Sequence, residues 1–175
     1  MSQGRNKDQR IGVFVDVQNL YYSAKNLYNK KVNFNTLLKE AIAERKLVRA
    51  IAYVIKADVK DKQTFYTILG EIGFEVRTKD LQVFYGGAKK GDWDVGITLD
   101  VMEYARESDI VVLASGDGDF DLLVKKIRHD YNSIVEVYGV PQLTAASLIN
   151  SASRFVPIEE RLLLKSVNGE LNPHI

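Results

Sequence analysis

Acidic residues gather in three short segments of the sequence. Asp16 lies in VFVDVQNL, Asp94 in KKGDWDVGITLD, and Asp117 and Asp119 in LASGDGDF. Carboxylate oxygens are the ligands that Mg²⁺ and Mn²⁺ prefer in proteins. Such an ion can polarise a phosphodiester and activate a water, which is the chemistry of metal-dependent nucleases. If these four aspartates converge in the fold, they predict a Mg²⁺ or Mn²⁺ site for phosphodiester hydrolysis.

Polar residues beside the aspartates are further candidates. Asn19 and Ser115 could orient a water or a phosphate oxygen, and Lys89 and Lys90 could contact a phosphate. Each candidate also has a simpler interpretation. An aspartate after a strand often caps a helix, a serine can bond to the backbone of its own turn, and a lysine pair in a loop is usually solvated. Gly116 and Gly118 would then only supply the positive φ of a sharp turn.

Short β-rich apolar runs alternate with helical patterns along the chain. The runs are 11–17, 48–55, 74–77, 110–114, 133–138 and a short stretch around Phe155. A loop at Gln18 and Asn19 is expected between the first strand and its helix. This alternation predicts an α/β fold, a three-layer α/β/α sandwich with a mostly parallel central sheet. Ligands bind beyond the carboxyl ends of such strands, where Asp16, Asp117 and Asp119 lie.

Two predicted helices, 93–107 and 120–129, flank the acidic segments. The first is expected to follow a flexible glycine loop, to be capped by Asp92 and to bury Val95, Leu99 and Met102. The second is expected to bury Leu122, Leu123 and Ile127 beneath a solvated basic face. Asp100 lies about 9 Å beyond Asp94 along the helix. It is therefore expected to lie behind the metal site or to face the solvent.

Composition narrows the classes of protein that this chain can belong to. The 175 residues carry a net charge of +1, contain no cysteine and include two histidines. A disulfide framework and a thiolate metal site are excluded, and a histidine-based zinc site has few ligands available. No apolar run approaches the ~20 residues of a membrane span, and residues 1–10 lack the apolar segment of a signal peptide. We expect a cytoplasmic protein with a flexible tail (1–10), one domain (11–157) and a C-terminal helix or tail (158–175).

In their order and spacing, the three acidic motifs resemble the NYN domain of the PIN-like nuclease superfamily, and its LabA-like branch in particular. The resemblance covers about residues 10–157. It implies that Asp16 is a metal-site carboxylate with Asn19 as its polar helper, and that Lys90, Gly91 and Asp94 match the family's Lys-Gly segment and following aspartate. It also implies that 115–119 form the family's Ser-Gly-Asp-x-Asp turn. The expected activity is a Mg²⁺- or Mn²⁺-dependent ribonuclease acting on single-stranded RNA.

Three classes of protein are alternatives to a ribonuclease. The main alternative is a non-catalytic regulatory or RNA-binding NYN module. A phosphatase would carry an Asp-x-Asp pair at the first strand, but Val17 and Gln18 follow Asp16. A dinucleotide-binding domain would have a Gly-x-Gly-x-x-Gly turn there. The RNA target, the choice between endo and exo cleavage and the oligomeric state, a homodimer included, are left open.

Overall fold

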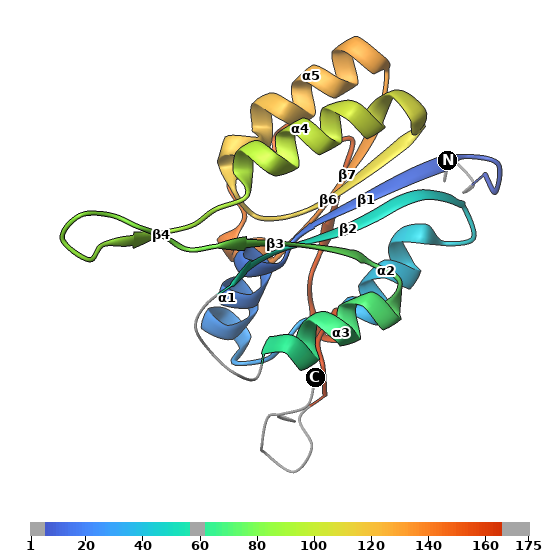
Figure 1. Ribbon diagram of the computed structural model, residues 1–175. Helices are drawn as coiled ribbons and strands as arrows, with labels where there is room; N and C mark the ends of the chain where they lie inside the picture. Colours follow the sequence, from blue (N-terminus) through green and yellow to red (C-terminus); the bar gives the residue numbers. More distant parts are fainter. Residues whose placement is uncertain (1–5, 57–61, 166–175) are drawn as a thin grey trace.

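Six parallel strands form the central sheet of the protein. The computed structural model describes residues 6–56 and 62–165. The strand order is β3-β2-β1-β6-β7-β8, and each neighbouring pair is parallel (Figure 1). The strands are β1 (Arg10–Asp16), β2 (Lys46–Lys56), β3 (Glu75–Asp80), β6 (Ile110–Ala114), β7 (Ile134–Gly139) and β8 (Arg154–Pro157). Strand β6 is buried along its whole length, as expected of a central strand covered on both faces.

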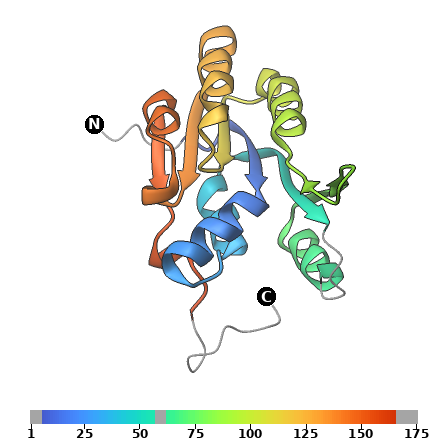
Figure 2. The same cartoon turned by 90° about the vertical axis from the view of Figure 1, so that its left-hand side faces the viewer.

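Helices cover both faces of this sheet, as Figure 2 shows. One face carries α1 (Val17–Tyr28), α2 (Phe34–Ile42) and α3 (Lys62–Ile72), and the other carries α4 (Asp94–Tyr104), α5 (Asp121–Tyr131) and α6 (Ala146–Ser151). Each face has its own cluster of buried apolar side chains. The predicted α/β/α sandwich with a parallel sheet is therefore confirmed. No helix in the described part of the chain has the length and apolar character needed to cross a membrane.

Short connections complete the chain. Within residues 6–56 and 62–165, 3-10 helices occur at Ala105–Glu107, Gly118–Phe120, Pro141–Leu143 and Glu160–Leu162. Asparagines end two of the α-helices: Asn29 and Asn132 have φ of 49° and 54° in the left-handed region, which asparagine tolerates well. Asn33 starts α2, because its side chain accepts a hydrogen bond of 3.0 Å from the backbone N–H of Thr36.

The strand order fixes where a ligand can bind. Strand β1 lies between β2 and β6, so the chain leaves β1 on one side and returns on the other. Loops diverge at such a point and leave a crevice beyond the carboxyl ends of the two strands. Asp16 is the last residue of β1, and Ser115 directly follows β6. The acidic segments therefore meet at the switch point of the sheet.

Two local predictions about loops were wrong. No loop separates β1 from α1: the helix begins at Val17, and Asp16 itself is its N-cap. The glycine loop is not wholly irregular, because β4 (Gln82–Val83) and β5 (Lys89–Lys90) pair in it as an antiparallel hairpin. Both strands are too short to stand out as a β-rich run in the sequence.

The predicted buried faces of α4 and α5 were also partly wrong. Val95 and Leu99 are 71% and 65% exposed, whereas Ile97 and Val101 are buried. Apolar residues occur all round α4, so their spacing could not select the buried face. Leu122, in the first turn of α5, is exposed as well, while Leu123 and Ile127 are buried as predicted.

Residues near both limits of the described part of the chain belong to the fold. Arg10 is already part of β1, and its guanidinium forms an ion pair with Asp109 at 3.0 Å. Residues 158–165 form a 3-10 turn and no α-helix, and Ile158, Leu162 and Leu163 are buried in the core. Residues 1–5 and 166–175 lie outside the described part of the chain.

Candidate metal centre

Three aspartates come together at the carboxyl edge of the sheet. Asp94, Asp117 and Asp119 each offer one carboxylate oxygen, and these oxygens lie within 4.8 Å of one another. Asp94 is the first residue of α4, whereas Asp117 and Asp119 belong to the turn after β6. A set of oxygen ligands without histidine or cysteine suits a hard divalent cation such as Mg²⁺ or Mn²⁺. This acidic cluster could therefore hold a divalent metal ion.

Asp16 lies beside the acidic cluster but is not one of the three grouped carboxylates. Its Oδ1 accepts a hydrogen bond of 3.3 Å from the backbone N–H of Asn19, and its Oδ2 accepts one of 3.1 Å from the hydroxyl of Ser115. Both bonds favour the charged form of the carboxyl group. The carboxylate is thus held in one orientation by the start of α1 and the end of β6.

The turn at 115–119 is ordered by its own side chains and by Asn19. The Ser115 hydroxyl accepts from the backbone N–H of Asp117 at 3.2 Å, and Asp117 Oδ1 accepts from that of Asp119 at 2.9 Å. Asn19 Oδ1 accepts from the backbone N–H of Gly116 at 2.8 Å. Asn19 and Ser115 therefore position the acidic residues through bonds within the protein.

The glycines of this turn do not have the positive φ of the simpler interpretation, and close packing requires them instead. Neither Gly116 nor Gly118 has a positive φ. A Cβ at Gly116 would lie 2.6 Å from the carbonyl oxygen of Leu143, and one at Gly118 would lie 2.8 Å from Cβ of Ala145. The turn packs so closely against the segment before α6 that no side chain fits. Such a contact between distant segments cannot be predicted from the local sequence.

Burial and mutual repulsion raise the pKa of two of these carboxyl groups. Burial raises the pKa of Asp16 to about 6, against the hydrogen bonds from Asn19 and Ser115, and the charges of Asp117 and Asp92 add to the increase. Burial likewise raises the pKa of Asp94 to about 6, with further contributions from four neighbouring carboxylates. A divalent cation would relieve this repulsion.

Asp92 is an acidic residue near the cluster whose position in the sequence predicted only a helix cap. Trp93, and not Asp92, occupies the N-cap of α4. The Asp92 side chain accepts a hydrogen bond of 3.3 Å from the backbone N–H of Asp94, and its charge raises the pKa of Asp16 and of Asp94. The Asp-x-Asp spacing of residues 92 and 94 repeats that of residues 117 and 119, and it could have indicated that Asp92 lies near the cluster.

Trp93 fixes the segment that carries Asp94. Its indole N–H donates a hydrogen bond of 3.0 Å to the carbonyl of Val54, and its ring lies 5.3 Å from that of Tyr53. The amine of Lys79 lies over the Trp93 ring, with Nζ 5.6 Å from the ring centre. The start of α4 is therefore tied to the carboxyl end of β2.

The two lysines predicted to contact phosphate lie on β5, just before this segment. Lys89 and Lys90 are both exposed. Lys90 Nζ lies 3.9 Å from Oδ2 of Asp92, which places one cation at the border of the acidic cluster. This position is compatible with the predicted contact, which stays a prediction.

Asp100 has a structural role at a distance from the cluster. It is buried, so the expectation that it could face the solvent was wrong. It accepts a hydrogen bond of 2.6 Å from the Tyr53 hydroxyl and forms an ion pair with Arg77. The strands β2 and β3 supply these partners, which a helix pattern alone could not reveal.

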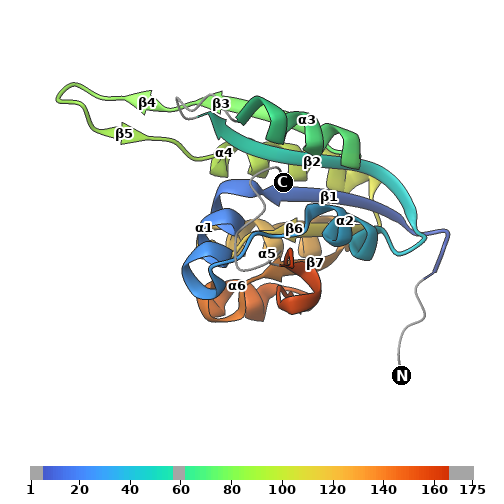
Figure 3. The ribbon, with the colours of Figure 1, turned by 90° about the horizontal axis from the view of Figure 1, so that it is seen from below.

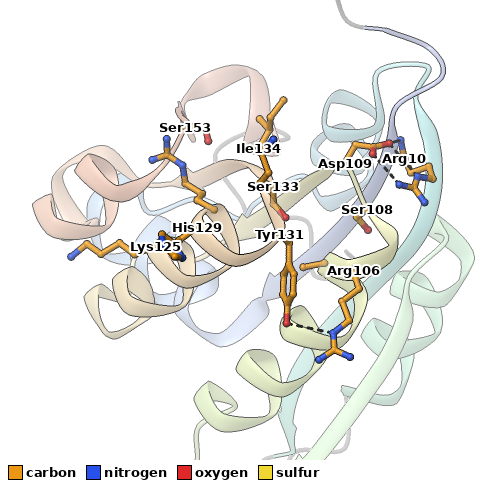
Figure 4. Close-up of a pocket in the computed structure, with 13 residues that line it drawn as sticks. Arg10, Arg106, Ser108, Asp109, Lys125, His129, Tyr131, Ser133, Ile134 and Ser153 are labelled. Carbon is orange, nitrogen blue, oxygen red and sulfur yellow. Dashed lines mark hydrogen bonds and ion pairs between the residues drawn. The ribbon is translucent and has the colours of Figure 1, made fainter.

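A second concave region lies at the opposite, amino edge of the sheet (Figure 4). Basic side chains line it, among them Arg10, Arg106 and Arg128. Arg10 pairs with Asp109, Arg106 donates to the Tyr131 hydroxyl at 3.4 Å, and Arg128 donates to the carbonyl of Ser151 at 2.6 Å. The residues that line it include one carboxylate, Asp109, so this region does not resemble a site for a divalent ion.

Comparisons with known proteins agree with this geometry. Residues 10–159 match the NYN domain family. The protein of Synechococcus elongatus described as "Low amplitude and bright protein LabA" is 25% identical over 163 residues, which cover 88% of this chain and 86% of LabA. A protein of unknown function from Vibrio parahaemolyticus, known from its crystal structure, is 43% identical with a TM-score of 0.86 over 93% of this chain and 100% of that one. With its parallel sheet and its aspartates at the switch point, this chain belongs to the NYN domain family, within the PIN-like nuclease superfamily.

Proposed function

We propose that this protein is a metal-dependent ribonuclease that hydrolyses phosphodiester bonds of single-stranded RNA. The observation that carries the proposal is the meeting of Asp94, Asp117 and Asp119, whose oxygens lie within 4.8 Å of one another. Three carboxylates repel one another unless a cation lies between them, and the sheet places them where ligands bind in open α/β folds. We assign Mg²⁺ or Mn²⁺ to this cluster and RNA to the substrate because the chain belongs to the NYN family.

The residues around the cluster have separate tasks in this mechanism. A bound divalent ion supplies positive charge that polarises a phosphodiester and makes water more acidic. Asp16, the last residue of β1, would complete the metal site from beside the cluster. Ser115 and Asn19 hold Asp16 and the acidic turn in place. Lys89 and Lys90, on β5, contact phosphates of the bound RNA.

The proposal is tested by cleavage of a labelled pool of single-stranded RNA in Mg²⁺, Mn²⁺ or EDTA. We expect cleavage with either metal, none in EDTA, and a loss of at least about 100-fold in Asp94→Asn and in Asp117→Asn. Asp130→Asn is the matched control, since it removes an exposed carboxylate that pairs with Lys126 on α5. This control should cleave like the wild type.

Two outcomes would contradict the proposal. Cleavage that persists in both cluster variants would point to a contaminating nuclease or to another site. Absence of cleavage over a broad RNA pool with both metals would favour the regulatory or RNA-binding module instead.

A further inference from the structure

The β4–β5 hairpin projects from the body of the protein and leads into α4, whose first residue is Asp94 (Figure 3). Gln82 pairs with Lys90 and Val83 with Lys89. The tip is closed by hydrogen bonds between Phe84 and the residues opposite it, to Ala88 at 2.8 Å and from Gly87 at 3.0 Å. Gly86 and Gly87 have φ of 97° and 83°, a conformation that other residues adopt only with strain. The hairpin is thus a defined turn with glycine where its geometry requires it.

The side chains on this hairpin combine aromatic rings with positive charge. Tyr85 at the tip is fully exposed, and Val83 and Phe84 are 66% and 49% exposed. Lys89 and Lys90 stand on the returning strand, and residues 82–91 include no carboxylate. Isolated two-stranded hairpins gain little stability in water by themselves, and exposed aromatic rings add cost without a partner. These features indicate a surface that binds a ligand.

The base of the hairpin is fixed to the acidic cluster. A Cβ at Gly91 would lie 3.0 Å from Cδ2 of Leu81 and 3.2 Å from Cγ2 of Ile55, so the end of β5 packs closely against the residue before β4 and against the end of β2. Asp92, Trp93 and Asp94 follow directly. The tip lies about 10 Å beyond the Gln82–Lys90 pair, the length of about three stacked nucleotides. The hairpin therefore leads directly into the segment that carries Asp92 and Asp94.

We infer that the β4–β5 hairpin is an arm that binds single-stranded RNA, with Phe84 and Tyr85 stacking on bases and Lys89 and Lys90 contacting phosphates. The inference rests on the proposed function for the identity of its ligand. Aromatic rings interleaved with cations are the usual means of binding a single strand without sequence preference. The arm carries two lysines and no carboxylate in residues 82–91, so its charge is complementary to a polyanion such as RNA. The arm would hold the strand while the carboxylates act on it.

Binding of the full-length protein to a fluorescent single-stranded RNA, measured by anisotropy in EDTA, tests this inference without cleavage. The double substitution Phe84→Ala, Tyr85→Ala should weaken binding at least about fivefold, and Tyr85→Phe, which keeps the ring, should bind like the wild type. Leu47→Ala removes an exposed apolar side chain at the amino end of β2 and is the matched control. Thermal unfolding of each variant checks that the fold is kept.

The lysines are tested by the dependence of binding on salt. Removing two phosphate contacts in Lys89→Gln, Lys90→Gln should reduce the slope of log K against log salt by about 1.4. Arg106→Gln, which removes a cation at the opposite edge of the sheet, should leave the slope unchanged.

Each result separates the arm from the nuclease proposal. Wild-type protein that binds RNA through the arm but never cleaves it would support the arm and overturn the nuclease. Unchanged affinity in the aromatic double variant would overturn the arm, as would wild-type protein that binds no RNA. A double variant that changes from dimer to monomer by light scattering while keeping its RNA affinity would also overturn it and show that the hairpin joins two copies.

Discussion

The hydroxyl of Ser115 donates a hydrogen bond of 3.1 Å to Oδ2 of Asp16. It joins the residue that follows β6 to the last residue of β1, two strands that lie side by side where the strand order reverses. Asn19 makes a second link between the same segments through the backbone of Gly116. The acidic residues are therefore held in place by the fold before any ligand arrives, which reduces the reorganisation needed for catalysis.

Ser115→Ala should shift the pH profile of RNA cleavage to higher pH. The hydrogen bond from Ser115 stabilises the charged form of Asp16, so its loss raises the pKa of Asp16 above the present value of about 6. A bond worth about 1 kcal/mol corresponds to roughly 0.7 pH units. The acid limb of the profile should move up by about that amount. Ser133→Ala is the control, because its buried hydroxyl has no hydrogen-bond partner among the described residues.

Stability of the metal-free protein should fall as pH rises from about 4 to 7. The pKa of Asp16 and of Asp94 is raised from 3.8 to about 6 in the folded state, so the native protein binds more protons than the unfolded chain in this interval. Stability then decreases with pH, and the contribution of protonation is lost as pH passes through 6. Asp16→Asn should flatten this dependence and raise the Tm of metal-free protein at pH 7.5 by about 2–6 °C.

Scanning calorimetry at pH 5.0 and 7.5, in EDTA, measures this effect. Asp130→Asn is the control, since the Lys126 amine holds the pKa of that exposed carboxyl below its usual value. Its removal should not raise the Tm. A wild type whose Tm is the same at the two pH values would contradict the assigned burial of Asp16.

Divalent ions should reverse this loss of stability through the acidic cluster. A ligand that binds the folded state stabilises it by RT ln(1 + [L]/Kd), or about 2.7 kcal/mol at 100 times Kd. We expect Mn²⁺ to raise the Tm of the wild type at pH 7.5 and to have little effect on Asp119→Asn. An equal increase in both proteins would place the ion elsewhere.

The sheet and the acidic edge could be predicted because their signals are local. Apolar runs such as Ile110–Ala114 mark buried strands by themselves, and parallel strands all end at one edge. The faces of α4 could not be predicted in this way, because Val95, Leu99 and Ile97 are all apolar and only packing decides which of them is buried. The hairpin was missed because its strands have two residues each.

Long-range contacts explain the remaining differences at the site. Gly116 has no side chain because a Cβ there would clash with the carbonyl oxygen of Leu143, and Asp100 forms an ion pair with Arg77. Asp92 was assigned to a helix cap because its sequence position suited that role, and its electrostatic effect on Asp16 needed the assembled sheet. The types and order of the residues thus predicted an acidic cluster, whereas only the fold shows which carboxylates lie together in it.

Gly116→Ala should disrupt the acidic turn, whereas Gly70→Ala should stabilise the protein. The new methyl group at 116 would lie 2.6 Å from a backbone oxygen that cannot move easily. The turn must shift, so we expect lower Mn²⁺ affinity and a loss of about 1–3 kcal/mol in stability. Gly70 lies within α3 with no atom within 4 Å of the added Cβ, so alanine there should add about 0.5–1 kcal/mol. Urea unfolding and Mn²⁺ titration of both variants measure the contrast.

Asp100→Asn should reduce stability and leave Mn²⁺ affinity unchanged, although Asp100 lies on the same helix as Asp94. Asp100 pairs with Arg77 and accepts from Tyr53, so its loss of charge leaves the partly buried guanidinium with only the more exposed Glu75 as a counter-ion among the described residues. Arg77 keeps some contact with solvent, so the cost should be about 1–3 kcal/mol, below that of a fully buried pair. Replacing both members, Asp100→Asn with Arg77→Met, should recover much of this loss, since the guanidinium is removed and the amide oxygen at position 100 still accepts from the buried Tyr53 hydroxyl. Urea unfolding and Mn²⁺ titration of the single and double variants distinguish a structural role of Asp100 from a role in metal binding. A drop in Mn²⁺ affinity without a drop in stability would place Asp100 in the metal site.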